Sequence, residues 1–274
     1  MTFISINKEK CHQDRHCVAT CPLALIGWDD QRNLPSAIDQ AEEMCIKCGH
    51  CVAICPTGAL SHLAMEEVKC ESVVKELLPS KEQTTHLLKA RRSVRQYHKK
   101  PIPKEILAAL IDVARFAPSG HNSQPVCWQV ESDSERIHQL GAMVVDWMHS
   151  ILAKDSEFPG GKVMEKVVTA WEEGVDSIIR GAPHVIIAHG DKANPLVSSA
   201  GTIALTYLEL AAFSHGLGAC WAGYFNLAAN MWKPLRSALA LPSGHVAVGS
   251  MMVGYPRYSY PRIPMRKPVK IVWR

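Results

Sequence analysis

Two copies of one cysteine pattern constrain the fold of this chain more than any other feature. Residues 11–22 read C-H-Q-D-R-H-C-V-A-T-C-P, and residues 45–56 read C-I-K-C-G-H-C-V-A-I-C-P. The copies are 34 residues apart and agree at seven of twelve positions. Two copies are too few for a solenoid, so they indicate a duplicated half-domain with pseudo-twofold symmetry.

The second copy has the spacing C-x2-C-x2-C-x3-C-P, which is typical of bacterial iron–sulfur proteins. Three thiolates on a short loop can reach three irons of one cluster, and the fourth cysteine binds the other cluster. We therefore expect two clusters. The predicted ligands of one are Cys21, Cys45, Cys48 and Cys51, and those of the other are Cys11, Asp14, Cys17 and Cys55.

Asp14 stands where the first copy lacks its second cysteine. We favour a role as an iron ligand, because Cys11, Cys17 and Cys55 are all present. A hard oxygen ligand among soft thiolates binds iron less firmly, so this iron would be labile. The first cluster is therefore expected to be 4Fe-4S with Asp14 bound. One alternative is a 3Fe-4S cluster with Asp14 unbound, and another is a lost cluster with Asp14 on the surface.

Cysteine usage indicates metal rather than disulfides. Seven of the ten cysteines lie in the first 55 residues, and no apolar run typical of a secretory signal precedes them. This pattern predicts a cytoplasmic protein. A structural zinc site is the alternative, but zinc sites usually pair two C-x2-C motifs, which these copies fit poorly. Cys70 matches neither cluster and is expected to be a free thiol.

Charge also divides the chain. Residues 1–80 carry 7 Lys and Arg against 11 Asp and Glu, a net charge of −4. Residues 81–274 carry 23 against 15, a net charge of +8. The total of +4 is too small and too unpatterned to indicate nucleic-acid binding. The longest stretch without charged residues, 210–232, contains glycines and polar side chains, so we expect a buried helix and a loop there, with no membrane span.

The second part of the chain alternates helices with a few strands, which indicates an α+β or α/β fold. Apolar residues recur at helical spacing from Ile106 to Ala114, and this helix is expected to end at Ala117-Pro118. Residues 202–215 are apolar almost all round, which predicts a buried central helix or one at a subunit interface. Strands are expected at 128–130, 183–188 and 246–253, and a short helix near residue 90.

Two further motifs suggest ligand contacts. The Arg-rich run at 91–95 could bind phosphate, since guanidinium groups match phosphate oxygens, or it could be a solvated basic patch. Residues 118–125 form a loop of small and amide residues, which could contact a flat heterocycle or be an ordinary turn.

The order RRSVR, APSGxNSQP, an apolar helix, GLGACWAG and a late Arg before Pro resembles the nitroreductase family of FMN-dependent reductases over residues 88–274. Residues 1–65 resemble the bacterial two-cluster ferredoxins. Together the resemblances imply a ferredoxin-fused nitroreductase of α+β class. A ferredoxin-like two-cluster iron–sulfur module (1–65) and a linker (66–87) would precede an FMN-binding α/β nitroreductase sandwich domain (88–274).

The second resemblance also implies which residues bind FMN. The Arg-rich run would bind its phosphate and ribityl chain, and the 118–125 loop would meet the flavin of the partner subunit. The segment after the central helix would lie along the ring, with the backbone N–H of Gly223 toward flavin N5. Arg266 fits a family Lys-x-Arg-x-Pro motif, but Pro264 replaces its basic residue, for which Lys267 or Arg262 could compensate. The implied FMN residues are Arg91, Arg92, Ser93, Arg95, Pro118, Ser119, Gly120, Asn122, Gln124, Cys220, Trp221, Gly223 and Arg266.

These cofactors indicate an oxidoreductase that passes electrons through two clusters to FMN and on to an organic acceptor, such as a nitroaromatic or a quinone. The expected partners are a second copy of the chain, reduced ferredoxin or NAD(P)H as donor, and a small organic acceptor. No side-chain acid–base pair stands out as catalytic. One alternative is an electron-transfer or redox-sensing flavoprotein without a dedicated organic substrate. Others are a reductive dehalogenase, an enone reductase or a flavin reductase.

Some residues are expected to have structural roles. Cys127 and Cys220 lie in apolar sequence, so burial is expected rather than reactivity. The 13 histidines show no metal-ligand spacing such as H-E-x-x-H. His184 is expected to be an ordinary hydrogen-bonded histidine. Residues 144–180 are expected either to cover the active site or to form a surface helix pair.

Overall fold

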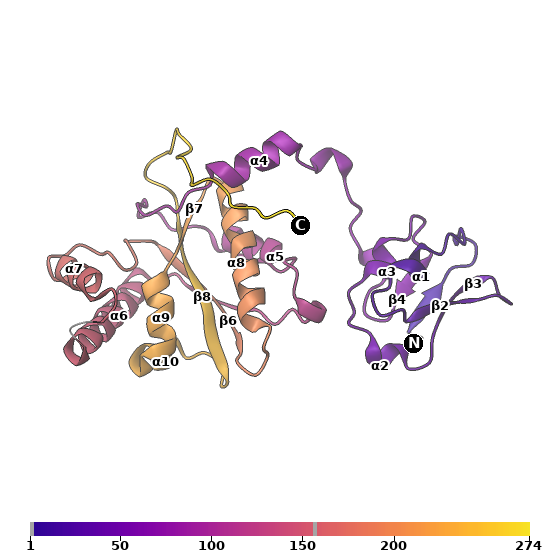
Figure 1. Cartoon of the computed structure of the whole chain (residues 1–274), viewed down its shortest axis with the longest axis horizontal. Coiled ribbons are helices and arrows are strands. Elements are labelled where there is room, and N and C mark those ends of the chain that lie inside the picture. Colours follow the sequence, from indigo (N-terminus) through magenta and orange to yellow (C-terminus); the bar gives the residue numbers. More distant parts are fainter. Residues whose placement is uncertain (1–2, 156–157) are drawn as a thin grey trace. The chain divides into compact units, whose positions relative to one another are not determined.

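A computed structural model of the chain describes residues 3–155 and 158–274. It divides into two compact units (Figure 1). Unit 1 comprises Met1–Leu78 with His121–Ser123, and unit 2 comprises Pro79–Gly120 with Gln124–Arg274. Residues 1–2, in the expected first module, and residues 156–157, in the 144–180 segment, lie outside the described residues.

Unit 1 is built from two small antiparallel sheets and three short helices. Strand β1 (Ile4–Ile6) pairs with β4 (Leu60–His62), which joins the two ends of the duplicated sequence. Strand β2 (Ile26–Asp29) pairs with β3 (Leu34–Ala37). The helices are α1 (His16–Thr20), α2 (Ala41–Met44) and α3 (His50–Ala53).

The backbone of unit 1 repeats as the sequence does. Helices α1 and α3 begin at residues 34 positions apart. Three pairs of residues with the same 34-residue offset have left-handed backbone angles, which non-glycine residues adopt only where the turn requires it. These pairs are Gln13 and Lys47 (φ 60° and 52°), Arg15 and Gly49 (59° and 74°), and Ala24 and Gly58 (52° and 60°). The duplicated half-domain predicted from the cysteine pattern is therefore present in the fold.

The chain between the cysteine region and the second fold is mostly extended. Two 3-10 turns, Glu67–Lys69 and Lys75–Leu77, belong to unit 1. Cys70 follows the first turn and is exposed. Helix α4 (Lys81–Ala90) begins unit 2. Its start is a capping box in which Ser80 and Gln83 each accept a hydrogen bond from the other's backbone N–H, so the predicted short helix is confirmed.

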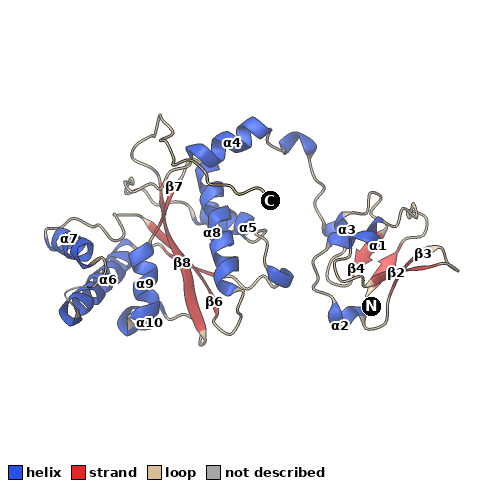
Figure 2. Cartoon of the chain, viewed as in Figure 1, coloured by secondary structure: helices blue, strands red, loops and turns tan. Residues whose placement is uncertain are grey.

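Unit 2 is built on a four-stranded antiparallel sheet in the order β5-β6-β8-β7. Figure 2 labels three of these strands, β6, β8 and β7. The strands are β5 (Cys127–Glu131), β6 (His184–Asp191), β8 (His245–Gly254) and β7 (Gly218–Trp221). The three predicted strands are confirmed, each longer than predicted. Alternate residues of β6 enter opposite cores: Val185 and Ile187 pack on one face, and Ile186 and Ala188 on the other.

Helices cover both faces of this sheet, which makes the predicted sandwich. Helices α5 (Lys104–Ala114) and α8 (Val197–Ser214) pack on one face. The other face packs against α6 (Ser134–Lys154), α7 (Gly161–Glu172), α9 (Gly223–Met231) and α10 (Lys233–Leu239). The predicted helix at 106–114 is confirmed, although it ends before Ala117. Within 144–180, the end of α6 and the whole of α7 form a helix pair.

Helix α8 is the predicted central helix, and one side of it is buried. Leu205, Leu208 and Ala212 are completely covered by α5 and the sheet. Its opposite side exposes Ile203, Tyr207 and Phe213. Among the described residues, the helices are all too short or too polar to cross a membrane.

Candidate cofactor sites

Four of the cysteines in unit 1 surround one small cavity. Cys21, Cys45, Cys48 and Cys51 all line it, together with Phe3 and His62. Backbone N–H groups donate to the sulfurs: that of Leu25 to Cys21 (3.3 Å) and that of Lys47 to Cys45 (3.3 Å). Burial raises the pKa of the Cys51 thiol to about 11. This thiol therefore needs a cation beside it to become a thiolate at neutral pH, and iron would provide one.

Three of the other predicted ligands also lie near one another. Burial raises the pKa of the Cys17 thiol, and nearby Cys55 and Asp14 raise it further. Burial acts in the same direction on Cys55, but hydrogen bonds from the Thr57 hydroxyl and from backbone N–H groups, including that of Ala59 (3.2 Å), lower its pKa overall. Cys11 is half-buried in the turn before α1.

Asp14 has a local partner as well as thiol neighbours. Its carboxylate accepts the backbone N–H of His16 (3.0 Å), and its second oxygen lies 3.3 Å from Nδ1 of the same residue. These contacts hold the carboxylate at the first turn of α1, which also carries Cys17. A donor set of seven thiols and one carboxylate suits iron–sulfur clusters, because thiolates that accept N–H hydrogen bonds are their usual ligands.

Unit 2 contains a cavity of about 300 Å³ at the end of β7 and the start of α9. Four residues implied to bind FMN line it, namely Arg95, Cys220, Trp221 and Gly223. Burial raises the pKa of the Cys220 thiol although Arg95 and Arg180 oppose this, so the thiol is protonated at neutral pH and not a nucleophile. A cavity with two guanidinium groups and an indole ring suits a ligand that is both flat and anionic, and FMN is one.

Arg180 lines the same cavity and was not among the predicted residues. Its backbone is left-handed, with φ of 62°. Asp176 holds this turn, because its carboxylate accepts the backbone N–H groups of Ile178 (3.0 Å), Ile179 (2.8 Å) and Gly181 (2.8 Å). The only sequence indication of this site was the expectation that the 144–180 segment covers it.

Glu209 is a second residue that sequence reasoning missed. This single acidic residue of the apolar helix α8 is buried, and it binds the Arg91 guanidinium at 2.7 Å. It also shares a hydrogen bond with the Trp221 side chain. Burial raises the pKa of Glu209, and Arg91 opposes that change. Glu209 thus connects two residues that were implied to bind FMN, and a lone charge on an otherwise apolar helix was the available signal.

The remaining implied FMN residues occupy several places. Ser93 forms a β-bridge with Ala219, the residue before Cys220, and Arg92 is half-buried. Pro118, Ser119 and Gln124 line a separate cavity of about 150 Å³ beside α8. The side-chain amide of Asn122 donates to the carbonyls of Ile46 (3.3 Å) and Lys47 (2.9 Å) within unit 1. Gly120 packs against Leu196, and Arg266 lies in the exposed C-terminal stretch.

The structure corrects one expectation for a cysteine and confirms another. Cys220 is buried, as predicted. Cys127 is exposed, because it is the first residue of β5, and β5 is an edge strand of the sheet. His184 is the buried, hydrogen-bonded histidine that was predicted: its Nε2 accepts the backbone N–H of Ile102 (2.8 Å), and its Nδ1 lies 2.9 Å from the Ser132 hydroxyl.

Comparison with known proteins identifies both parts of the chain. The model of the nitroreductase family matches residues 88–255, and the model of the 4Fe-4S dicluster domain matches residues 3–57. A Methanothermobacter thermautotrophicus protein, provisionally named as an NADH dehydrogenase/NAD(P)H nitroreductase, is 26% identical over 184 residues, which are 65% of this chain and 79% of the relative. Zebrafish (Danio rerio) iodotyrosine deiodinase is 35% identical over 71 residues, which are 26% of this chain and 24% of that relative.

Solved structures agree on the fold of unit 2. A nitroreductase with bound FMN from Desulfitobacterium hafniense DCB-2 matches with a TM-score of 0.56 and 22% identity. The match covers 69% of this chain and 98% of that one. Residues 88–255 therefore match the nitroreductase family in sequence, and unit 2 resembles an FMN-bound nitroreductase in fold.

Proposed function

Because the chain belongs to the nitroreductase family and carries a 4Fe-4S dicluster domain, we propose that it is an FMN- and iron–sulfur-dependent oxidoreductase that passes electrons through two clusters to FMN and on to an organic acceptor. The acceptor class is a nitroaromatic, a quinone or a similar molecule. The observation that carries the proposal is the presence of both sets of cofactor-binding residues in one chain. Bound FMN would accept single electrons and deliver them in pairs. We propose domain limits of 1–65, 66–87 and 88–274.

The clusters are assigned to two ligand groups. Cys21, Cys45, Cys48 and Cys51 share a cavity, which supports their assignment to one 4Fe-4S cluster. The effects of nearby Cys55 and Asp14 on the pKa of Cys17 support a second cluster that also uses Cys11. Asp14 is proposed as its fourth ligand, because a carboxylate that accepts the backbone N–H of His16 through one oxygen keeps further lone pairs for iron.

In unit 2, the proposed FMN site is the cavity lined by Arg95, Arg180 and Trp221. The two guanidinium groups would hold an anionic group of the cofactor, and the indole ring would contact a flat one. Glu209 positions Trp221 and Arg91, and Asp176 positions Arg180. No residue is assigned as catalytic, and Gly223 keeps its proposed role of presenting a backbone N–H to flavin N5. Arg92, Ser93 and Arg266 are proposed to bind the phosphate side.

A homodimer is part of the proposal. In one chain, Ser119 and Gln124 line a different cavity from Arg95 and Trp221, as expected if the 118–125 loop serves a partner's flavin. Exposed apolar side chains also support a homodimer. One of them is Tyr207, on the outer side of α8. The C-terminal stretch is exposed throughout and includes large apolar side chains, namely Tyr258, Tyr260, Ile263, Met265, Val269, Ile271, Val272 and Trp273.

The proposed donor is reduced ferredoxin or NAD(P)H. The acidic residues of the first 80 positions would favour a protein donor with a basic docking surface over the anionic NAD(P)H. Clustered thiols that must stay reduced to bind iron favour a cytoplasmic location.

The proposal is tested by anaerobic turnover with reduced ferredoxin as donor and a nitroaromatic or a quinone as acceptor. Protein with clusters and FMN should turn over, and protein loaded with FMN but lacking iron should lose most ferredoxin-dependent activity. Reduction of the acceptor at an undiminished rate without iron would contradict a route through the clusters. If no organic acceptor is turned over while cofactors are reduced, the chain is an electron-transfer protein.

Reductive dehalogenation is a second candidate, because 71 residues are 35% identical to iodotyrosine deiodinase. A halogenated phenol in the same assay would release halide in step with electrons consumed. Nitro or quinone reduction with no halide release would leave the first candidate in place.

A further inference from the structure

Three metal-ligating side chains converge at one end of the unit 2 sheet, outside both proposed cofactor sites. Cys127 opens β5, His189 lies near the end of β6, and His245 opens β8. Cys127 pairs directly with His189 across the strands. His245 pairs with Asp191, two residues from His189, so its side chain is the diagonal neighbour of His189. A register shift between Ala188 and His189 changes the backbone at this point.

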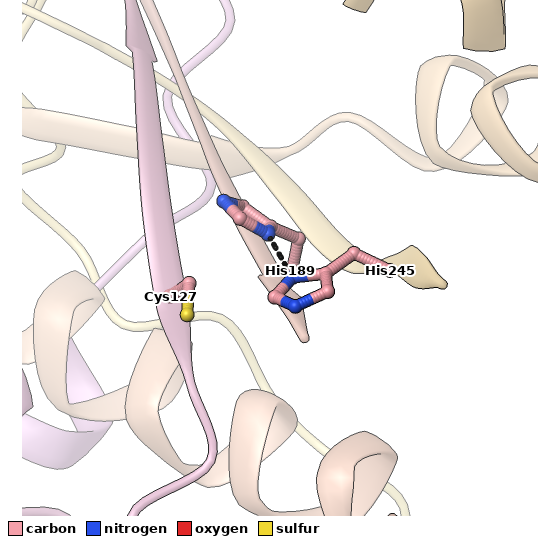
Figure 3. Close-up of side chains that lie close together, drawn as sticks. All are labelled: Cys127, His189 and His245. Carbon is pink, nitrogen blue, oxygen red and sulfur yellow. Dashed lines mark hydrogen bonds between the residues drawn. The ribbon is translucent and has the colours of Figure 1, made fainter. Parts of the chain in front are cut away.

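The three ligand atoms lie within 4.8 Å of one another. The two imidazole Nδ1 atoms are only 2.9 Å apart. Figure 3 shows the two rings joined by this hydrogen bond, with the Cys127 sulfur on the neighbouring strand. A hydrogen bond between two Nδ1 atoms requires that one carries a proton and the other presents its lone pair. A metal ion can replace that proton and accept both lone pairs at once.

We propose that Cys127, His189 and His245 bind one divalent transition-metal ion of the Zn²⁺ class, with its fourth position open to solvent. A thiolate and two imidazoles are the soft and borderline ligands that such ions select, whereas Mg²⁺ and Ca²⁺ prefer oxygen. Three protein ligands leave one tetrahedral position free. The exposed Cys127 lies on the edge strand, which gives an ion access from solvent.

The surroundings favour a ready ligand set. His189 is only 5% exposed, so its ring is held in place by packing. Its Nδ1 already faces that of His245, so two of the three ligand atoms lie together.

A bound ion would join three strands next to a loop that matters for the proposed function. Gly190 follows His189, and a Cβ atom at this position would lie 2.6 Å from the carbonyl oxygen of Pro125. The end of the 118–125 loop therefore packs directly on the backbone beside the site. The ion would fasten the start of β5, and the loop before it, to the centre of the sheet. This expectation is independent of whether the loop contacts FMN.

Zinc content tests the proposal. The full chain, loaded anaerobically with clusters and FMN, is equilibrated with buffered micromolar Zn²⁺ and separated from free metal, and then iron and zinc are measured by mass spectrometry. We expect one zinc per chain with iron unchanged. Cys127→Ser and His245→Gln should each weaken zinc binding by at least ~100-fold, more than the loss of an outer hydrogen bond to a ligand costs. Cys70→Ser, which removes another exposed thiol, should keep the zinc.

Two further readouts make the result independent of folding. Zinc should raise the melting temperature of the wild-type chain and of Cys70→Ser, but not that of Cys127→Ser. Because Cys127 is exposed, its replacement by serine should not disturb the core. X-ray absorption at the zinc edge should give one sulfur at about 2.3 Å and two nitrogens at about 2.0–2.1 Å. The proposal is overturned if zinc does not bind, if it binds equally to the two ligand variants, or if its shell lacks sulfur.

Discussion

The two units differ in what fills their interior. The hydrophobic cluster of unit 1 contains four buried residues, Cys17, Ile26, Val52 and Leu60, and one of them is a predicted iron ligand. Unit 2 has two cores of 24 and 13 buried residues, one on each face of its sheet. A domain of fewer than roughly 70–80 residues rarely gains enough stability from a single core, and metal often makes up the difference. Unit 1 is thus organised around its ligands, whereas unit 2 is a packed scaffold with sites at its edges.

Removal of iron should give the largest effect and separate the two units. Chelation under reducing conditions should unfold unit 1, because binding free energy is folding free energy in such small metal domains. The backbone amides of unit 2 should stay protected from hydrogen exchange, since its cores contain none of the predicted iron ligands. Hydrogen exchange with peptide resolution measures both units in one sample. Persistent slow exchange in β1, β4 and α3 after full iron removal would mean that the small core suffices.

Substitution of one ligand should sharpen the comparison within unit 1. Cys48→Ser should lose the cluster that it shares with Cys21, Cys45 and Cys51, so iron content should fall by about half or more. FMN content should stay the same, because the proposed flavin site lies within unit 2. Cys70→Ser is the matched control and should keep all its iron. Iron and flavin are quantified after anaerobic purification, and a full iron content in Cys48→Ser would remove it from the ligand set.

In unit 2 the proposed FMN site should depend on hydrogen bonds within the protein rather than on a metal ion. Asp176→Ala removes three backbone contacts that fix the turn carrying Arg180. Hydrogen bonds to a charged group contribute about 1.5–3 kcal/mol each, so FMN should bind at least ~10-fold more weakly. Titration of the flavin-free protein, followed by fluorescence, gives the affinity. Asp146→Ala, on the exposed side of α6, should bind FMN as the wild type does. Equal affinity in both variants would show that the turn is not needed.

A smaller effect should come from a buried histidine of the unit 2 scaffold. Burial lowers the pKa of His184, so the folded chain binds fewer protons there than the unfolded chain. The stability contributed by this neutral ring is complete above the ordinary pKa of about 6.5 and is lost as the pH falls below it. The slope cannot exceed about 1.4 kcal/mol per pH unit for one proton.

The control for this prediction is a second histidine. His184→Gln should flatten the acid side of the stability profile of unit 2, while His86→Gln, at an exposed position of α4, should leave it unchanged. Denaturant unfolding between pH 5 and 8 measures the difference. Identical profiles for the wild type and His184→Gln would contradict the assignment.

How much of this could be predicted from sequence depended on how local each feature is. The cysteine spacing predicted the duplication because three of the four ligands of each cluster lie close together in the sequence, and the 34-residue offset reappears in the backbone angles of Gln13 and Lys47. Strand β7 and helices α9 and α10 were not predicted. The strands and helices of unit 2 that were predicted were found because their apolar residues follow the period of a helix or a strand. Their ends differed by a few residues, where caps and pairing partners decide.

Features made by distant residues were missed. Arg180 lines the same cavity as Cys220 and Trp221, which are far from it in the sequence, and Glu209 meets Arg91 across 118 positions of the chain. Cys127 has apolar neighbours in sequence, which predicted burial, but the order of the sheet places its strand at an edge. His189 and His245 have no recognisable spacing, because three strands bring them to Cys127.

The central claim is that electrons reach the flavin through the clusters of the same chain. We would mix the fully loaded protein anaerobically with reduced ferredoxin and follow cluster and flavin absorbance in time, for the wild type and for Cys48→Ser with a full FMN content. The account predicts that the clusters bleach before the flavin in the wild type, and that the variant reduces its flavin far more slowly. Flavin reduction at the same rate in both proteins would contradict it.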